Sequence, residues 1–591
     1  MLRRLNNEPI IFLLRKVWRF AEGKRWLVVL YLLFFVASNI VTFFEPLLIG
    51  FILNELQQNG INETNFQYVA LLCGGFFFLY LSFWFFHGFG RVWENTLSFV
   101  VSQTYREYLL RGVVDLPLAW HTDRDSGDTI DKINKASKSI EEFLGASFLV
   151  VQSFVSALGT VVVLWFFDLW IALGVFVLVA MALYVMYRWD RVLVPQYMRL
   201  NEYDNKISAK VFDALSNITS VIILRIQKVV ASSTALSFWQ PYGLFVRNTR
   251  LNEIKWFTVS FFFTAIVVVF LILYLYQEMT AGRALQIGTV SALYLYLQNS
   301  SNVFRNFGWL YSEIIQQKAS VENADPLEQA ISNHQIIART PYTMRTFQVA
   351  NLRFSYDTNN PSANALSVDH FAVKRGERVA LIGESGSGKT TFLKVLHGLY
   401  PVVYADIAVN DEYVPQLFTD LDLGTMLVPQ EPELFSASIR ENITLGLEYS
   451  DEAIQTVLDQ ARFSKVVADL PKGLESVVNE KGVNLSGGQK QRLALARALL
   501  FAQDKQIMLL DESTSSVDPQ NEAKIYEQIF ASFHEKTFIA SIHKMNLLRY
   551  FDRIVIFDQG SIRTEGTFDW LLETDESFRH QWEEFQNQRT G

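Results

Sequence analysis

The sequence predicts an all-α transmembrane domain of six helices, followed by an α/β domain of the P-loop type. Its first half holds six apolar runs long enough to cross a membrane. Its second half alternates short apolar strands, such as Arg378–Ile382, with helical segments around a glycine-rich loop, Gly383–Thr390, which is the pattern of a mixed sheet. At 591 residues, with 50% hydrophobic residues, the chain also exceeds what one soluble core usually organises. We therefore expect a membrane domain over 1–325, a linker over 326–345 and the α/β domain over 346–591.

The apolar runs set the expected topology of the first domain. They lie near residues 26–53, 67–90, 146–167, 169–187, 256–277 and 286–309. An even number of spans places both ends of the domain on one side of the membrane. The flank before the first span is rich in Arg and Lys, whereas the following loop, residues 54–65, has neither. By the positive-inside tendency, both ends face the cytoplasm.

Connections between the spans differ in length. Spans three and four meet at Phe167–Leu169, which predicts a tight outer turn, while long charged segments separate spans two and three and spans four and five. We expect those segments to be helices that protrude into the cytoplasm. Residues 10–22 mix apolar and basic positions as a helix at the membrane surface would. The alternative is a cytoplasmic extension of the first span.

Charge and cysteine content narrow the class of protein. A net charge of −8 with a pI near 5.7 gives no basic excess, so nucleic acid is not an expected partner. The single cysteine, Cys73, can form no internal disulfide, and its apolar surroundings predict a small buried residue. The first apolar run is too long for the core of a cleavable signal, so the first helix is expected to stay inserted.

The glycine-rich loop is suited to binding phosphate, because glycines let the backbone curl round an anion and the next helix points its N–H groups at it. The loop residues expected to line the phosphates are Gly383, Ser385, Gly386, Ser387 and Gly388. Lys389 would reach the β- and γ-phosphates, Thr390 would supply a hydroxyl to Mg²⁺, and Thr391 would contact the α-phosphate side.

An apolar strand, Ile507–Leu510, ends in two acids. Asp511 suits the outer coordination sphere of Mg²⁺, and Glu512 suits the general base that polarises the attacking water. His543, after the strand Thr537–Ala540, would hold the γ-phosphate. An acidic pair taken alone is more often a solvated strand end, but this pair follows a phosphate-binding loop.

With these parts in place, the segment Leu485–Gln489, Leu-Ser-Gly-Gly-Gln, makes the chain resemble the ATP-binding cassette (ABC) proteins. The resemblance implies a P-loop α/β ABC ATPase domain that uses ATP and Mg²⁺. It implies that Ser486 and Gly488, with Gly487 and Gln489 beside them, cap the γ-phosphate of ATP held by a partner subunit. Hydrolysis would then require two domains that close head to tail.

Other positions resemble the family less specifically. Tyr356 resembles the aromatic residue that stacks on adenine, and Gln430 resembles the glutamine that touches Mg²⁺ and senses the membrane domain. Ser515–Asp518 resembles the loop that joins the two active sites. The alternatives are that Tyr356 is a core aromatic residue and Gln430 a loop amide.

The membrane half narrows the resemblance to exporters with six spans fused ahead of the ATPase, over essentially the whole chain. Leu116–Gly127 and Asn217–Ile222 look like the two cytoplasmic coupling segments, and Glu480–Gly482 like the loop that contacts them. Two departures are Phe568, where the family often has histidine, and Ala405–Asp411, which lacks the usual glycines.

The expected function is ATP-driven export of an amphipathic or hydrophobic substrate, such as a lipid, a drug-like molecule or a peptide, by alternating access. The alternatives are an importer of a metal chelate or an ATP-gated channel or regulator. Because Lys389, Ser486, Glu512 and His543 are all present, a homodimer is expected, although a degenerate partner chain would also fit. We expect a multi-pass protein among membrane lipids, in a bacterial inner (plasma) membrane with the ATPase domain in the cytoplasm.

Polar residues within the spans bear on the substrate. Arg91 and Arg305 could line a central cavity and attract an anionic head group. Alternatively, these polar residues pair with one another or mark the cytoplasmic ends of helices. Glu45, just before Pro46, is interpreted as a structural acid beside a helix kink.

Overall fold

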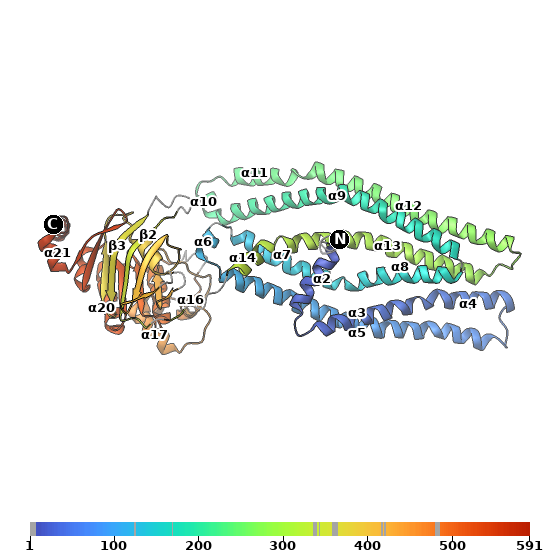
Figure 1. The fold of residues 1–591 in the computed structure, drawn as a ribbon, viewed down its shortest axis with the longest axis horizontal. Coiled ribbons are helices and arrows are strands. Elements are labelled where there is room, and N and C mark those ends of the chain that lie inside the picture. The colour runs from blue at the N-terminus through green and yellow to red at the C-terminus, as the bar shows by residue number, and fades with distance from the viewer. Residues whose placement is uncertain are drawn as a thin grey trace. The chain divides into compact units, whose positions relative to one another are not determined.

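The computed structural model describes residues 8–590 except 123, 125, 168, 335–339, 342, 357–364, 415–417, 419–420 and 479–484. It divides into two compact units, drawn in Figure 1. The first comprises the chain up to Asp115 and Ser126–Asn333, and the second comprises Leu116–Asp125 and His334–Gly591. The division after Asn333 falls within the stretch expected to be the linker.

The first unit is helical. Its helices are α2 (Pro9–Phe20), α3 (Arg25–Thr42), α4 (Phe44–Asn59), α5 (Phe66–Val114), α7 (Ser126–Gly145), α8 (Ser147–Phe167), α9 (Leu169–Ser216), α10 (Ile218–Ile223), α11 (Gln227–Trp239), α12 (Tyr242–Thr280), α13 (Ile287–Glu322) and α14 (Asp325–Asn333). Helices α3 and α4 run beside α5, and α9 runs beside α12 (Figure 1). At 49 residues, α5 is about 74 Å long, more than twice the hydrocarbon core, as expected of a span with a cytoplasmic extension.

Each predicted span falls on a helix, but they differ in how apolar they are. Among the described residues, four helical stretches are long and apolar enough to cross a membrane: Arg25–Asn59, Phe66–Val114, Ser147–Phe166 and Gln227–Thr280. The predicted span 169–187 lies in α9, where many side chains are outside the description. The predicted span 286–309 lies in α13, which does not reach the apolarity of the other four.

Helix α13 is held by its neighbours at two places. Leu293 and Leu297 are buried in one cluster with Leu164 of α8 and Val259 of α12, so neighbouring helices cover part of this helix. At its N-terminus, the Asn54 carboxamide accepts a hydrogen bond from the Gly288 N–H at 2.8 Å. The apolar residues of α13 thus pack on its neighbours, whereas Gln298 and Asn299 are exposed.

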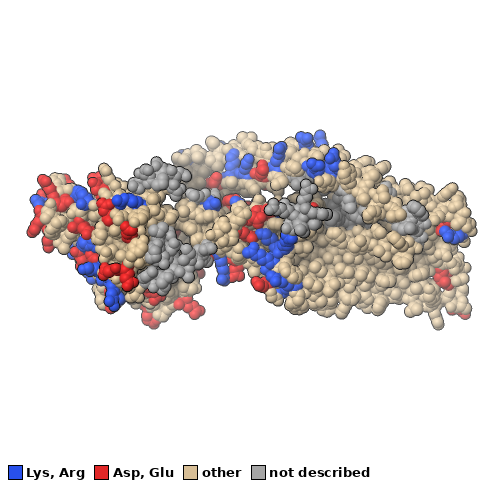
Figure 2. Space-filling view, in the orientation of Figure 1, with Lys and Arg blue, Asp and Glu red and all other residues tan. Residues whose placement is uncertain are grey.

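Helix α2 is separate from the first span, so the alternative of a continuous extension is wrong. A turn with Gly23 at φ 78° lies between α2 and α3, and Leu13, Val17 and Phe20 are buried on one face of α2. Figure 2 shows Lys and Arg side chains gathered near α2 and the start of α3. The apolar face packs against helices α5, α7 and α13 of the same unit, so a place at the membrane surface stays a prediction for α2.

Helix α2 is tied to α14, the helix that leaves the last span. Lys16 forms ion pairs with Asp325 at 3.0 Å and with Glu328 at 2.5 Å, and Tyr105 of α5 donates to Glu328 at 2.8 Å. The Lys16 and Glu328 side chains are only 13% and 11% exposed. This network fixes the N-terminal helix to the end of the membrane unit.

An ion pair on α5 bridges a break between α7 and α8. The Arg91 guanidinium bonds to Glu94 and donates to the Gly145 carbonyl, the last residue of α7, at 2.9 Å. Glu94, fully buried, accepts from the Phe148 N–H in the first turn of α8 at 3.1 Å. The cation therefore sits at a helix C-terminus and the anion at a helix N-terminus, each at the end of the helix dipole that favours it.

The second unit contains two larger sheets. Its strands are β1 (Thr340–Pro341), β2 (Thr346–Phe354), β3 (Leu366–Lys374), β4 (Arg378–Ile382), β5 (Tyr404–Val409), β6 (Glu412–Val414), β7 (Leu421–Asp422), β8 (Thr425–Val428), β9 (Ile507–Asp511), β10 (Thr537–Ser541), β11 (Arg553–Asp558) and β12 (Ser561–Gly566). One sheet has the order β12-β11-β4-β10-β9-β8, parallel except for β12, and the other is antiparallel in the order β3-β2-β5-β6. The predicted mixed sheet and its strands at 378–382, 507–510 and 537–540 are confirmed.

Helices accompany these sheets. They are α6 (Leu118–Thr122), α15 (Lys389–Leu396), α16 (Ile439–Thr444), α17 (Asp451–Gln460), α18 (Ser464–Asp469), η1 (Gly473–Glu475), α19 (Gly487–Phe501), α20 (Pro519–Ser532), η3 (Met545–Tyr550), α21 (Phe568–Thr574) and α22 (Glu576–Thr590). All residues of β9 and β10 are buried, so these strands form the centre of the main sheet. The parallel strands β4, β9 and β10 end at one edge, where loops from distant parts of the chain meet.

The buried pair on α5 generates a stability prediction. Glu94→Gln should lower the free energy of unfolding by about 3 kcal/mol, because it leaves the Arg91 charge beside a neutral group and weakens the cap on α8. The measurement is reversible chemical unfolding in mixed micelles. The matched control is Glu107→Gln on the same helix, since Glu107 pairs with Arg111 but is 58% exposed; it should cost less than about 1 kcal/mol. Equal losses for the two variants would contradict the role assigned to the buried pair.

Candidate functional site

The glycine-rich loop joins β4 to α15 and has the backbone shape expected of a phosphate cradle. Gly383, Gly386 and Gly388 have φ values of 147°, 82° and 105°, in a region that side chains disfavour. A Cβ on Gly383 would stand 2.3 Å from the Phe557 carbonyl oxygen, and one on Gly388 would stand 2.9 Å from a Leu366 methyl group. Glycine is therefore required at both ends of the loop.

Lys389 lies inside this loop. Its ammonium donates to the carbonyl oxygens of Gly383 and Glu384 at 2.7 and 2.9 Å, and the residue is only 5% exposed. Burial lowers the pKa of Lys389, while the carboxylates of Glu512 and Asp511 oppose that shift. A buried ammonium held by weak neutral acceptors is poised to bind an anion that enters the loop.

Two of the predicted metal-binding residues touch each other. The Thr390 hydroxyl donates to the Asp511 carboxylate at 2.8 Å, which links the first turn of α15 to the end of β9. Asp511 is 2% exposed, and burial raises its pKa, with the Thr390 hydrogen bond opposing. Hydroxyl and carboxylate oxygens are the donors that Mg²⁺ prefers.

Glu512 is held from both sides. Its carboxylate accepts from the Gln430 amide at 2.6 Å and lies 2.5 Å from Nε2 of His543. The backbone of Glu512 has φ 46°, an uncommon value for a residue other than glycine, and this conformation takes the chain out of β9. The structure thus brings together three residues that the sequence predicted separately.

Tyr356 stands at the margin of the same site. Its hydroxyl lies 2.9 Å from the Thr391 hydroxyl, and the rings of Phe354 and Tyr400 contact its ring edge-on at centroid distances of 4.8 and 5.5 Å. Tyr356 is nevertheless 56% exposed. An anchored ring with this exposure is not a core residue, and it offers a surface on which a base could stack.

The segment Leu485–Gln489 ends at the start of α19. Ser486 is the N-cap, its hydroxyl accepting from the Gln489 N–H at 3.3 Å, while the Gln489 carboxamide accepts from the Ser486 N–H at 2.9 Å. A Cβ on Gly488 would stand 2.5 Å from the Ser516 carbonyl oxygen. Among the described residues, the neighbours of this segment therefore include the Ser515–Asp518 loop of the same chain, and no hydrogen bond joins the segment to Lys389.

Gln491 connects two of these loops through three hydrogen bonds, and the sequence reasoning did not single it out. Its side chain, in a residue only 5% exposed, donates to the Gln430 carbonyl at 3.1 Å and to the Ser515 hydroxyl at 3.0 Å, and accepts from the Ser516 N–H at 2.9 Å. The sequence does hold a signal for this residue: Gln491 is polar and lies two positions after Gln489, on the face of α19 that is buried.

A nucleoside triphosphate with Mg²⁺ fits the chemistry of these residues. The glycine cradle and the buried ammonium suit phosphate, and Thr390, Asp511 and the Gln430 amide offer oxygen donors to a hard cation. Glu512 lies next to these groups in a position to accept a proton from water.

The resemblance also named segments away from this edge. Leu116–Asp125 groups with the second unit, and Asn217–Ile222 coincides with α10 and the residue before it. Glu480–Gly482 lies outside the described residues. The segment Ala405–Asp411 needs no glycine, because Asn410 and Asp411 adopt φ values of 55° and 63°, which their short polar side chains tolerate.

Family models match both halves of the chain. The model described as ABC transporter transmembrane region matches residues 28–301, and the one described as ABC transporter matches residues 366–515. A bacterial Atm1-family ABC exporter, solved with ATP bound, has the same fold with a TM-score of 0.81 over 95% of this chain and 98% of the other, at 22% identity.

Curated relatives with different names are similar to the chain. The mitochondrial iron-sulfur clusters transporter ATM1 of Kluyveromyces lactis is 26% identical over 82% of this chain and 67% of its own length. The ATP-dependent lipid A-core flippase of Pseudoalteromonas translucida is 26% identical over 88% of each chain. The probable multidrug resistance ABC transporter YheI of Bacillus subtilis is 36% identical over 40% of each chain.

The loop contacts of Gln491 generate a prediction about catalysis. Gln491→Ala should lower kcat for nucleotide hydrolysis by about tenfold or more, because several hydrogen bonds that register the loops are lost, while nucleotide affinity stays within about twofold. The measurements are steady-state hydrolysis and equilibrium nucleotide binding. Gln455→Ala, at an exposed amide on α17, is the control and should leave both unchanged. A purely structural role would instead lower thermal stability and affinity together.

Proposed function

This chain belongs to the ABC transporter family, and we propose that it exports an amphipathic or hydrophobic molecule by alternating access. It is a multi-pass membrane protein with an ATPase domain and is therefore an ATP-driven translocase. The two matched regions, 28–301 and 366–515, support membrane and ATPase halves in one chain. The observation that carries the proposal is Glu512, held between Gln430 and His543 beside the phosphate-binding loop.

These contacts support a division of roles during hydrolysis. Glu512 takes a proton from the attacking water, and His543 orients the Glu512 carboxylate and contacts the γ-phosphate. Lys389 leaves its carbonyl acceptors for the β- and γ-phosphates, a charge-assisted exchange that anions favour. Gln430 bonds Glu512 through its side chain and meets Gln491 through its backbone, so a movement of that loop reaches the catalytic carboxylate.

Mg²⁺ is part of the proposal. Thr390 and Gln430 would hold the ion, with Asp511 in its outer sphere, and when bound it neutralises charge that develops on the phosphates. The Thr390–Asp511 hydrogen bond supports this assignment, because it places a hydroxyl and a carboxylate together at the end of β9.

The working unit is proposed to be two identical chains. Lys389, Glu512 and His543 form one half of a site, while Ser486 caps the start of α19, whose Gly488 approaches Ser516 of the Ser515–Asp518 loop. A second chain placed head to tail would bring its Ser486 segment to the phosphates of the first. Because no catalytic position is degenerate, such a dimer would have two competent sites.

The relatives are named for different substrates: an iron-sulfur cluster, a lipid A core and multiple drugs. Because these names do not agree, the proposed substrate class rests on the membrane half of this chain. The hypothesis that Arg91 attracts an anionic head group is not supported, because its guanidinium already bonds to Glu94 and to the Gly145 carbonyl. The side chain of Arg305 lies outside the description. An apolar or amphipathic molecule taken from the bilayer remains the proposal.

Hydrolysis provides the first test. Glu512→Gln should lower the ATPase rate of the chain in lipid by about 100-fold or more and leave ATP binding intact, since only the base is lost. The measurements are phosphate release and nucleotide binding. Glu535→Gln, an exposed acid paired with Arg375, is the control. Hydrolysis at the normal rate in the Glu512 variant would remove this residue from the proposed role.

Vesicles of defined orientation test direction and assembly. ATP added on the side of the ATPase domain should move a lipophilic probe away from that side, and the importer alternative predicts the opposite movement. Mass photometry of the chain alone in nanodiscs should give the mass of two copies. A single copy that hydrolyses no ATP would point instead to a different partner chain.

A further inference from the structure

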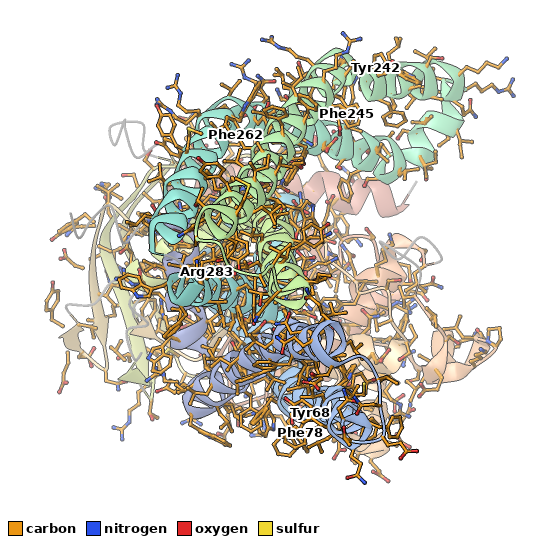
Figure 3. All side chains as sticks on the ribbon, turned by 90° about the vertical axis from the view of Figure 1, so that its right-hand side faces the viewer. Tyr68, Phe78, Tyr242, Phe245, Phe262 and Arg283 are labelled. Atoms are coloured by element: carbon orange, nitrogen blue, oxygen red, sulfur yellow. The ribbon has the colours of Figure 1, made fainter. Side chains whose placement is uncertain are left out.

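A groove of about 660 Å³ opens on the first helical unit between the α3–α4 junction and α5. Its walls are mostly aromatic, and the rings come from one face of α5: Phe76, Phe77, Tyr80, Phe83 and Trp84. Phe77, Tyr80 and Trp84 are 67%, 59% and 50% exposed. Figure 3 shows Tyr68 and Phe78 of the same helix on the outside of the bundle, so α5 presents a broad aromatic surface outward. A volume of this size suits a drug-sized molecule.

One charged group lines this groove. The Glu45 carboxylate belongs to it, in the first turn of α4, and Glu45 is exposed. The groove is lined by no Lys, Arg or His, and the described residues give Glu45 no hydrogen bond or ion pair. Its interpretation as an acid beside a helix kink agrees with the break at Phe43, but that position leaves the carboxylate without a cation.

The groove lies far from the basic side of the membrane. Glu45 follows Arg25, the first residue of α3, by a helical path of about 30 Å, which is the thickness of a hydrocarbon core. The groove residues of α5 begin at Cys73, about 10 Å from the start of that helix at Phe66. Glu45 is therefore expected near the outer boundary of the hydrocarbon core, where its exposed carboxylate lies beside the aromatic rings and can attract a cation.

We propose that the Glu45 groove is a binding site for a hydrophobic monocation that enters from the outer half of the bilayer. The carboxylate supplies the single charge partner, and the faces of Tyr80, Phe83 and Trp84 supply cation–π contacts and apolar area. A zwitterionic phospholipid fits less well, because the lining offers its phosphate no cationic or amide partner. The site goes beyond the proposed function, since binding requires neither hydrolysis nor transport.

Equilibrium binding of radiolabelled tetraphenylphosphonium to the chain in phosphatidylcholine nanodiscs, without nucleotide, tests the site. Wild type should bind one ion per chain above the signal of empty nanodiscs, and uncharged triphenylphosphine oxide should not compete. Glu45→Gln should weaken binding by about tenfold or more, and Glu45→Asp should retain part of it. The matched control is Glu63→Gln, which removes an exposed acid of the outer loop and should leave binding unchanged.

The single cysteine gives a second measurement on the folded protein. Cys73 is exposed and lines the groove, so its sequence-based interpretation as a buried residue is wrong; the reason is that it faces outward from α5 instead of into the bundle. Prior reaction of Cys73 with a bulky membrane-permeant maleimide should abolish tetraphenylphosphonium binding, and Cys73→Ala should make binding insensitive to the reagent.

Three results would overturn the site. They are absence of saturable binding to wild type, equal competition by the neutral oxide, and equal losses in Glu45→Gln and Glu63→Gln. Because nucleotide is absent from each of these measurements, their failure leaves the ATPase and transport experiments to be judged separately.

Discussion

The second unit depends on one geometric constraint: a fully buried parallel strand, β9, must end in two carboxylates. Asp511 remains buried because the Thr390 hydroxyl satisfies it, and Glu512 turns away from the strand because its backbone adopts a positive φ. These adjacent residues have different partners. Asp511 bonds to Thr390 after the phosphate-binding loop, and Glu512 contacts Gln430 and His543. The other loops of the site are arranged round this strand end, and Gln491 holds two of them in register.

Much of this site could be predicted from the sequence, because its residues follow short apolar strands. The strand before the loop was predicted with the bounds of β4, and the strands before Asp511 and His543 to within a residue of β9 and β10. Local pattern fixes such elements, since a buried strand is apolar throughout and ends where polar residues begin. Gln491 was missed because nothing local distinguishes a glutamine that bonds two loops from one that faces water.

The contacts of the membrane half were less predictable from the sequence, because they too depend on tertiary neighbours and not on local pattern. Helix positions followed from apolar runs, but the pairing of Arg91 with Glu94 and the break after Gly145 depend on which helices become neighbours. Helix α13 also shows the limit of an apolar pattern, because its Leu293 and Leu297 are buried against neighbouring helices while Gln298 and Asn299 of the same helix are exposed. In both halves, local sequence pattern thus predicts where helices and strands lie, whereas the partners of charged side chains depend on the tertiary structure.

The ion pairs of helix α2 have a consequence for the order of synthesis. Lys16 and Glu328 lie 312 positions apart, and the entire membrane half is translated between them. At ordinary rates of translation, Lys16 leaves the ribosome about 15–60 s before its carboxylate partner exists. During that interval the helices α5 and α7, which also contact α2, are synthesised and become available to it before α14. The contact with α14 then closes when the last span is complete and before most of the ATPase domain has been made, so the first and last parts of the membrane half are joined at the moment when that half can finish folding.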